Sequence, residues 1–284
     1  MYLRARADWP LLALAAVCLI GFWVVYLVFV QTHHGQRVDD AALAGRAVAS
    51  RGTSAAGHLL NTISVGSLVL AIALLVAQAL VRGRPDLSVV AAAVIVGSVL
   101  CAEVLKHDLL PRPVLALGPL PHPSYPSGHT AVAFSVGVAA TLCVPVRLRR
   151  RTALVAVLYG SAVGVATVAA GWHRPSDVAG GLLLVISFAA AIAALARIDD
   201  RSADVPGTAG RDPGRYLIGG LLVLLAGWLV AIGIVVASQS GALDWTLGSA
   251  AFFGACAAIL ALASLLMAAL LWTLQTVGRS SRSL

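Results

Sequence analysis

Three short segments of this chain carry cationic, hydroxyl and imidazole side chains that together suit the handling of a phosphate group. Arg112 offers a planar fork of donors that matches phosphate oxygens, and Lys106 adds a compact positive charge. Ser127 and Gly128 directly precede an apolar stretch, so Ser127 can cap a helix whose first N–H groups would face an anion. His129 would lie in the first turn of that helix, where it can donate a proton to a leaving group.

The third segment has the spacing of an activated histidine. His173 and Asp177 are four residues apart, with Pro175 between them. If Pro175 opens a helix, Asp177 lies in its first turn and can fold back to accept a hydrogen bond from one nitrogen of His173. The other nitrogen is then unprotonated and can act as a nucleophile.

The composition indicates that these side chains are positioned within a membrane protein. Apolar residues make up 60% and charged residues 11% of the chain, whereas soluble domains average about 45–50% and about 25%. The net charge of +8 is therefore expected to reflect membrane topology and lipid headgroups. We expect the lipid bilayer as a partner and no nucleic acid.

Long apolar stretches predict an all-α fold, a polytopic membrane helical bundle. A helix needs about 20 apolar residues to cross a bilayer. Eight spans are expected, at about 9–30, 59–81, 88–105, 128–144, 153–171, 178–196, 216–237 and 247–274. Residues 31–57 are polar and are expected to form a loop with some helix, and the proline-rich segment 106–127 cannot be a regular helix throughout.

The distribution of positive charge predicts an orientation. If the N-terminus lies inside, the cytoplasmic segments, including a basic turn at 147–151, hold 14 of the 20 Lys and Arg residues. This asymmetry places both termini in the cytoplasm. The proline-rich loop and the connection at 171–177 then face outside together, so that one site can be built from both.

The motifs in these segments resemble those of a known family. Arg112-Pro113, Pro126-Ser127-Gly128-His129 and His173-x-x-x-Asp177 look like the three signature motifs of the type-2 phosphatidic acid phosphatase superfamily, which is related to vanadium haloperoxidases. The resemblance covers roughly residues 55–197 and implies a six-helix core. It implies that His173 attacks phosphorus, that Asp177 orients His173 and that His129 protonates the leaving oxygen. It implies that Lys106, Arg112, Ser127 and Gly128 hold the phosphate, with no metal and no cofactor.

The sequence departs from the family pattern at two places. Five residues separate Lys106 from Arg112, whereas the family usually has six. Ala166-Thr167 stand where the third motif usually opens with Ser-Arg, so one phosphate-binding arginine is missing. Arg174, beside the expected nucleophile, is a candidate to supply that charge.

The expected location points to a lipid substrate. A cationic site at the outer interface suits a phosphate on a lipid whose tails stay in the bilayer, such as phosphatidate, phosphatidylglycerol phosphate or polyprenyl diphosphate. Abundant Arg, Ala, Val and Gly with a single Lys indicate a bacterium with a GC-rich genome, hence a bacterial plasma membrane. We expect hydrolysis. The alternatives are phosphate transfer through the same histidine and a lipid-binding module that lacks catalysis.

Three regions are expected along the chain. Residues 1–197 would form the phosphatase-like core, 198–215 a cytoplasmic linker rich in glycine and proline, and 216–284 a C-terminal transmembrane hairpin with a tail. Small residues in the hairpin would permit close helix packing, either as the surface of a homo-oligomer or as a brace for the core.

Overall fold

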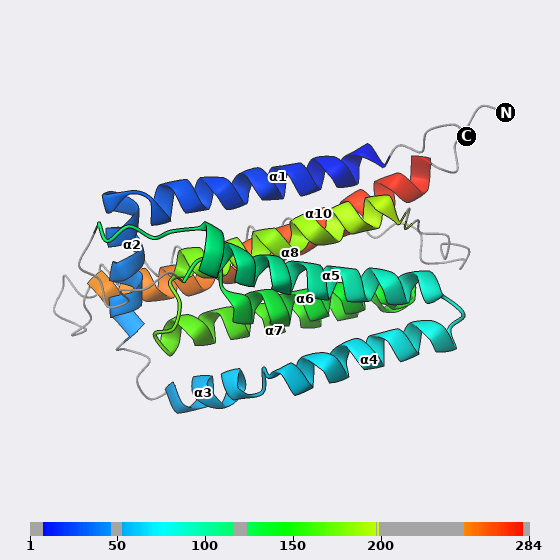
Figure 1. Cartoon of the computed structure of the whole chain (residues 1–284), viewed down its shortest axis with the longest axis horizontal. Helices are drawn as coiled ribbons and strands as arrows, with labels where there is room; N and C mark the ends of the chain where they lie inside the picture. The colour runs from blue at the N-terminus through cyan, green and yellow to red at the C-terminus, as the bar shows by residue number, and fades with distance from the viewer. Residues whose placement is uncertain (1–7, 47–52, 116–123, 197, 199–246, 281–284) are drawn as a thin grey trace.

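The chain folds into a bundle of roughly parallel and antiparallel helices (Figure 1). The computed structural model describes residues 8–46, 53–115, 124–196, 198 and 247–280. The described helices are α1 (Trp9–Val25), its π-helical continuation η1 (Tyr26–Val30), α2 (His33–Ala44), α3 (Thr53–Asn61), α4 (Val65–Val81), α5 (Pro85–Val104), its π-helical continuation η3 (Leu105–Leu109), α6 (Gly128–Cys143), α7 (Val146–Ala169), α8 (Pro175–Leu195) and α10 (Leu247–Ser280).

The all-helical membrane fold is confirmed. Five helices of the described part are long and apolar enough to cross a membrane: Trp9–Val30, Pro85–Leu109, Val146–Ala169, Pro175–Leu195 and, within α10, Ser249–Val277. Two shorter apolar helices, α4 and α6, lie at two further expected spans. The remaining expected span, 216–237, falls outside the described residues.

The second expected span is shorter than the sequence suggested. It was expected to begin at about residue 59, but α3 ends at Asn61 and α4 begins at Val65. Ser64 caps α4, because its side chain accepts from the Ser67 N–H at 3.1 Å and the Ser67 hydroxyl accepts from the Ser64 N–H at 2.9 Å. This reciprocal capping fixes a helix start inside an apolar run.

The expected basic turn at 147–151 is also wrong. These residues form the first turns of α7, and the chain reverses at Val144 and Pro145. The carbonyl of Pro145 accepts the first hydrogen bond of α7, from the N–H of Leu148 at 2.8 Å. Proline favours this position because it cannot continue a helix and pre-sets the chain for the next one.

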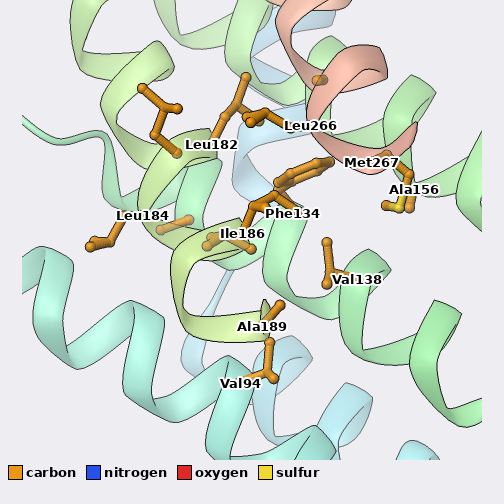
Figure 2. Close-up of a cluster of buried hydrophobic side chains, with 14 of the residues drawn as sticks. Val94, Phe134, Val138, Ala156, Leu182, Leu184, Ile186, Ala189, Leu266 and Met267 are labelled. Carbon is orange, nitrogen blue, oxygen red and sulfur yellow. The ribbon is translucent and has the colours of Figure 1, made fainter. Parts of the chain in front are cut away.

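Helix α8 lies at the centre of the bundle. It packs against α1, α5, α6 and α10, and its residues Leu182, Ile186 and Ala189 are fully buried. Figure 2 shows these side chains among Phe134 of α6 and Met267 of α10. In a bilayer, such close packing is what holds helices together, because lipid tails are as apolar as the side chains.

The last described helix, α10, takes part in the same packing. α10 contacts α2, α7, α8 and α1 and buries Ile259, Leu266, Met267 and Leu270. This placement supports the expectation that α10 braces the core. The division into core, linker and hairpin stays a prediction, because 199–246 lie outside the described residues.

Helix α2 crosses one end of the bundle, at the end of α1 and near the starts of α6 and α8 (Figure 1). It occupies most of the first half of the expected loop 31–57, so the expectation of some helix there is confirmed. Gly35 allows the close fit, because a Cβ at that position would overlap the backbone of Val28 and Phe29. All the segments expected to carry the site meet at this end.

The packing of Tyr125 against α8 generates a test of the fold. A Cβ added at Gly180 would lie 2.5 Å from the ring of Tyr125, whose hydroxyl donates to the Phe22 carbonyl at 2.7 Å. Gly180→Ala should therefore destabilise the protein by about 1–3 kcal/mol, as overpacking does, and lower its melting temperature in detergent.

Gly66→Ala is the matched control. The nearest atom to a Cβ at Gly66 is the Ser64 hydroxyl at 3.7 Å, so this change should keep or slightly raise the melting temperature. Equal melting temperatures for the two variants would contradict the packing described here.

Candidate active site

The three predicted motifs come together at the end of the bundle that α2 crosses. Arg112 follows η3, Ser127 caps α6, and His173 precedes α8. The starts of α6 and α8 are tied directly, because the N–H of Ser127 donates to the carbonyl of Asp177 at 2.8 Å. The second and third motifs are thus held in one rigid unit.

His173 and Asp177 form the predicted pair. Pro175 is the first residue of α8, so Asp177 lies in its first turn, as the spacing predicted. His173 Nδ1 is 3.4 Å from Asp177 Oδ2, and the same oxygen accepts from the Arg174 N–H at 2.8 Å. The side chain of Asp177 is fully buried. A carboxylate in this place favours the tautomer with the proton on Nδ1, which leaves Nε2 with its lone pair.

The second histidine faces the first. The ring centroid of His129 lies 6.4 Å from that of His173 and 5.3 Å from that of Trp172. Ser127 caps α6 as predicted, since its hydroxyl oxygen accepts from the Thr130 N–H at 3.3 Å. The cap fixes the first turn of α6, and with it the position of His129.

Arg112 is buried beside this pair. Its side chain is 5% exposed, and its Nη1 lies 3.9 Å from Asp177 Oδ1. Neither Nη1 nor Nη2 has a hydrogen-bond acceptor among the described residues. Burial lowers the pKa of Arg112, and the charge of Asp177 acts in the opposite direction. A buried guanidinium with unused donors is suited to an oxyanion that enters the site.

The comparison with protein families agrees with this geometry. Residues 65–202 match the family model of the PAP2 superfamily. This stretch, just under half of the chain, is similar to the PAP2 superfamily. The match confirms the resemblance to the type-2 phosphatidic acid phosphatases and, with the apolar helices, indicates a membrane phosphatase. Comparisons with curated proteins and with solved structures gave no match.

The PAP2 match begins with α4 and ends after α8, so that α1, α2, α3 and α10 lie outside it. The six-helix core expected from the resemblance included the first span. In the structure α1 packs along α8 although the family match does not cover it. Within the described ranges, no group of three or more His, Cys, Asp or Glu side chains is placed to hold a metal ion.

The shortened first PAP2 motif still brings Lys106 to the site. Lys106 lies in the π-helical turn η3, and its Nζ is 3.4 Å from where a Cβ at Gly128 would be. Nζ also donates to Glu103 Oε1 at 2.8 Å, and that carboxylate abuts Gly128. The carboxylate of Glu103 therefore occupies part of the space above the start of α6.

The missing PAP2 arginine has no direct replacement at its own position. Thr167 is fully buried, and its hydroxyl donates to the Gly164 carbonyl at 2.7 Å. Its carbonyl accepts from the His173 N–H at 3.2 Å, so it supports the loop that carries the histidine. Arg174 is buried next to His173, and its Nε donates to Asp40 Oδ1 at 2.6 Å.

Sequence reasoning missed three carboxylates at the site: Asp39, Asp40 and Glu103. Asp39 accepts from the N–H of Ser176 at 3.1 Å and from the Ser176 hydroxyl. The one available signal was the adjacency of two acids in a chain with only 12 Asp and Glu. A buried carboxylate is costly without partners, but the sequence does not reveal which residues those partners are.

Glu103 provides a test of the anion site. Its carboxylate neutralises Lys106 and lies where the N-terminus of α6 would attract a phosphate. Glu103→Gln should therefore strengthen competitive inhibition by inorganic phosphate severalfold, and more at low salt than at high salt.

Asp108→Asn is the matched control, because Asp108 is an exposed carboxylate of η3, the π-helical turn that directly follows the end of α5 where Glu103 lies. It should leave inhibition by phosphate unchanged. An equal effect of both variants would show that only net charge matters, and not the position of Glu103.

Asp39 provides a test by pH. Burial and the nearby charge of Asp177 raise its pKa from 3.8 to about 7, while Ser176 and Arg112 act in the opposite direction. The folded protein therefore binds this proton more tightly than the unfolded chain, and Asp39 contributes stability at low pH that is lost as pH rises through about 7.

Melting curves in detergent should show this loss between about pH 4 and pH 7 in the wild type. Asp39→Asn, which has no proton to lose, should show a smaller loss over the same range. Parallel curves for the two proteins would contradict the raised pKa of Asp39.

Proposed function

We propose that this protein is an integral membrane phosphatase that hydrolyses a lipid phosphate or diphosphate through a phosphohistidine intermediate. The observation that carries the proposal is a buried His173, held at Nδ1 by Asp177 and facing His129 across 6.4 Å. The two imidazole rings are therefore close enough to act on one phosphoryl group. Arg112, with unused donors beside Asp177, supports the same location.

The proposed reaction has two displacements at phosphorus. His173 Nε2 attacks phosphorus while the bond from phosphorus to the leaving oxygen breaks, and His129 gives a proton to that oxygen. A water molecule then attacks the phosphohistidine and loses its proton to His129. Cleavage of the P–N bond releases inorganic phosphate and restores His173.

The positive charge needed for this reaction is proposed to come from the protein itself. Arg112, Lys106 and the N-terminus of α6, with Ser127 and Gly128, would hold the phosphate. Arg174 is proposed as a further cation. We therefore propose that neither a metal ion nor a cofactor takes part.

The position of the site at the end of an apolar bundle supports a lipid substrate. The phosphate headgroup of a lipid could enter between polar loops while the lipid tails remain among the helices. Phosphatidate, phosphatidylglycerol phosphate and polyprenyl diphosphate all fit this description. The asymmetry of positive charge supports a site on the outer face of a bacterial plasma membrane with both termini in the cytoplasm.

The test is release of inorganic phosphate by the purified protein in detergent, with a chelator present, from each of these three lipids. His173→Ala should lower the rate by at least about a thousandfold, because removing a nucleophile abolishes the covalent route. The control is His58→Ala, an exposed histidine of α3, which should keep full activity.

The other outcomes separate the alternatives. No release from any lipid by a folded wild-type protein would contradict hydrolysis. A phosphorylated product that forms only when alcohol acceptors are added would identify a phosphotransferase. Lipid binding without either product would identify a binding module.

A further inference from the structure

Two adjacent carboxylates of α2 contact the segment that carries the proposed nucleophile. Asp40 Oδ1 accepts from Arg174 Nε at 2.6 Å, and Asp39 Oδ1 accepts from the Ser176 N–H at 3.1 Å. More than 130 residues separate the partners in each pair. Arg174 and Ser176 flank the first residue of α8, so α2 fixes the beginning of that helix from outside.

The same helix also holds the segment that contains Arg112. Gln36 Nε2 donates to the Pro113 carbonyl at 2.8 Å, and Gln36 Oε1 accepts from the Leu115 N–H at 3.3 Å. Just before α2, Tyr26 and Gln31 both donate to the Pro111 carbonyl at 2.8 Å. One short helix therefore sets the relative position of the first and third motifs.

Arg174 lies close to Arg112 within this arrangement. Both residues meet the carboxylate of Asp177, since Arg112 Nη1 lies 3.9 Å from Oδ1 and the N–H of Arg174 donates to Oδ2 at 2.8 Å. The charge of Arg174 accordingly lowers the pKa of Arg112. Like charges held this close repel each other. The carboxylates of Asp40 and Asp177 offset part of that repulsion, and an oxyanion that contacts both guanidinium groups would offset it further. A carboxylate bonded to Nε fixes the plane of the Arg174 guanidinium and leaves the direction of its Nη groups defined.

Given the proposed function, we infer that Asp40 is a positioning residue, which holds Arg174 as the second phosphate-binding guanidinium of the site. Arg174 would thereby supply the charge that Thr167 does not provide. Both Asp40 and its helix lie outside residues 65–202, the part that matches the PAP2 superfamily.

The rival explanation is that Asp40 only neutralises a buried charge. Removing one partner of a buried ion pair destabilises a protein, whereas removing both can be neutral. The experiment therefore compares Asp40→Asn with the double variant Asp40→Asn/Arg174→Gln. Asp86→Asn is the matched control, because it breaks an exposed ion pair with Arg84 (2.7 Å) at the start of α5.

Two quantities are measured for each variant in detergent. The first is KM and kcat for phosphate release from the best lipid substrate. The second is the rise in melting temperature caused by inorganic phosphate, which reports binding without turnover. We expect Asp40→Asn to raise KM by about 10- to 100-fold, as expected for the loss of a charged hydrogen bond, with a smaller change in kcat. We also expect it to lose most of the stabilisation by phosphate.

The double variant separates positioning from neutralisation. It should recover the melting temperature of the wild type in the absence of phosphate but keep the raised KM. A double variant with normal KM, or an Asp40→Asn variant with the KM and phosphate response of Asp86→Asn, would overturn the inference while leaving the phosphatase proposal intact.

The phosphatase proposal can fail separately. If inorganic phosphate stabilises the wild-type protein but the protein releases no phosphate from any lipid, hydrolysis is contradicted. The melting data would still decide the role of Asp40. A wild-type protein with neither activity nor stabilisation by phosphate would overturn both proposals.

Discussion

The site depends on the burial of one carboxylate at the end of an apolar helical bundle. Asp177 has no exposed side-chain surface, so its charge must be matched by donors and cations. It is matched by the N–H of Arg174, by Nδ1 of His173 and at longer range by Arg112. The backbone carbonyl of Asp177 also accepts a hydrogen bond from the N–H of Ser127, in the second motif. Satisfying this single residue therefore assembles all three motifs.

The remaining charges form a balanced cluster around that centre. Asp39 and Asp40 come from α2. Arg174 contacts Asp40, and Arg112 lies 3.9 Å from Asp177. Asp39, with a pKa raised to about 7, is partly protonated near neutral pH, which reduces the negative charge of the cluster. A phosphate that enters would bring negative charge to guanidinium groups that are already oriented, so little reorganisation is needed on binding.

The sequence predicted the features that depend on local spacing and missed those that depend on tertiary contacts. The pairing of His173 with Asp177 and the cap at Ser127 follow from positions within one or two turns of a helix. The carboxylates of α2 act on residues more than 130 positions away, and no local pattern reveals such partners. The break before α4 was missed because capping at Ser64 overrides the apolar pattern around it. The early start of α7 was missed because its first turns are basic and not apolar.

The central claim is that His173 carries the phosphoryl group between two displacements. The direct measurement is to mix wild-type protein with the best lipid substrate, quench within milliseconds in alkaline denaturant to preserve phosphohistidine, and map the modified residue by mass spectrometry. The account predicts a phosphoryl group on His173, which disappears as inorganic phosphate is released. Turnover with phosphate on another residue, or with no modified residue at any time, would contradict it.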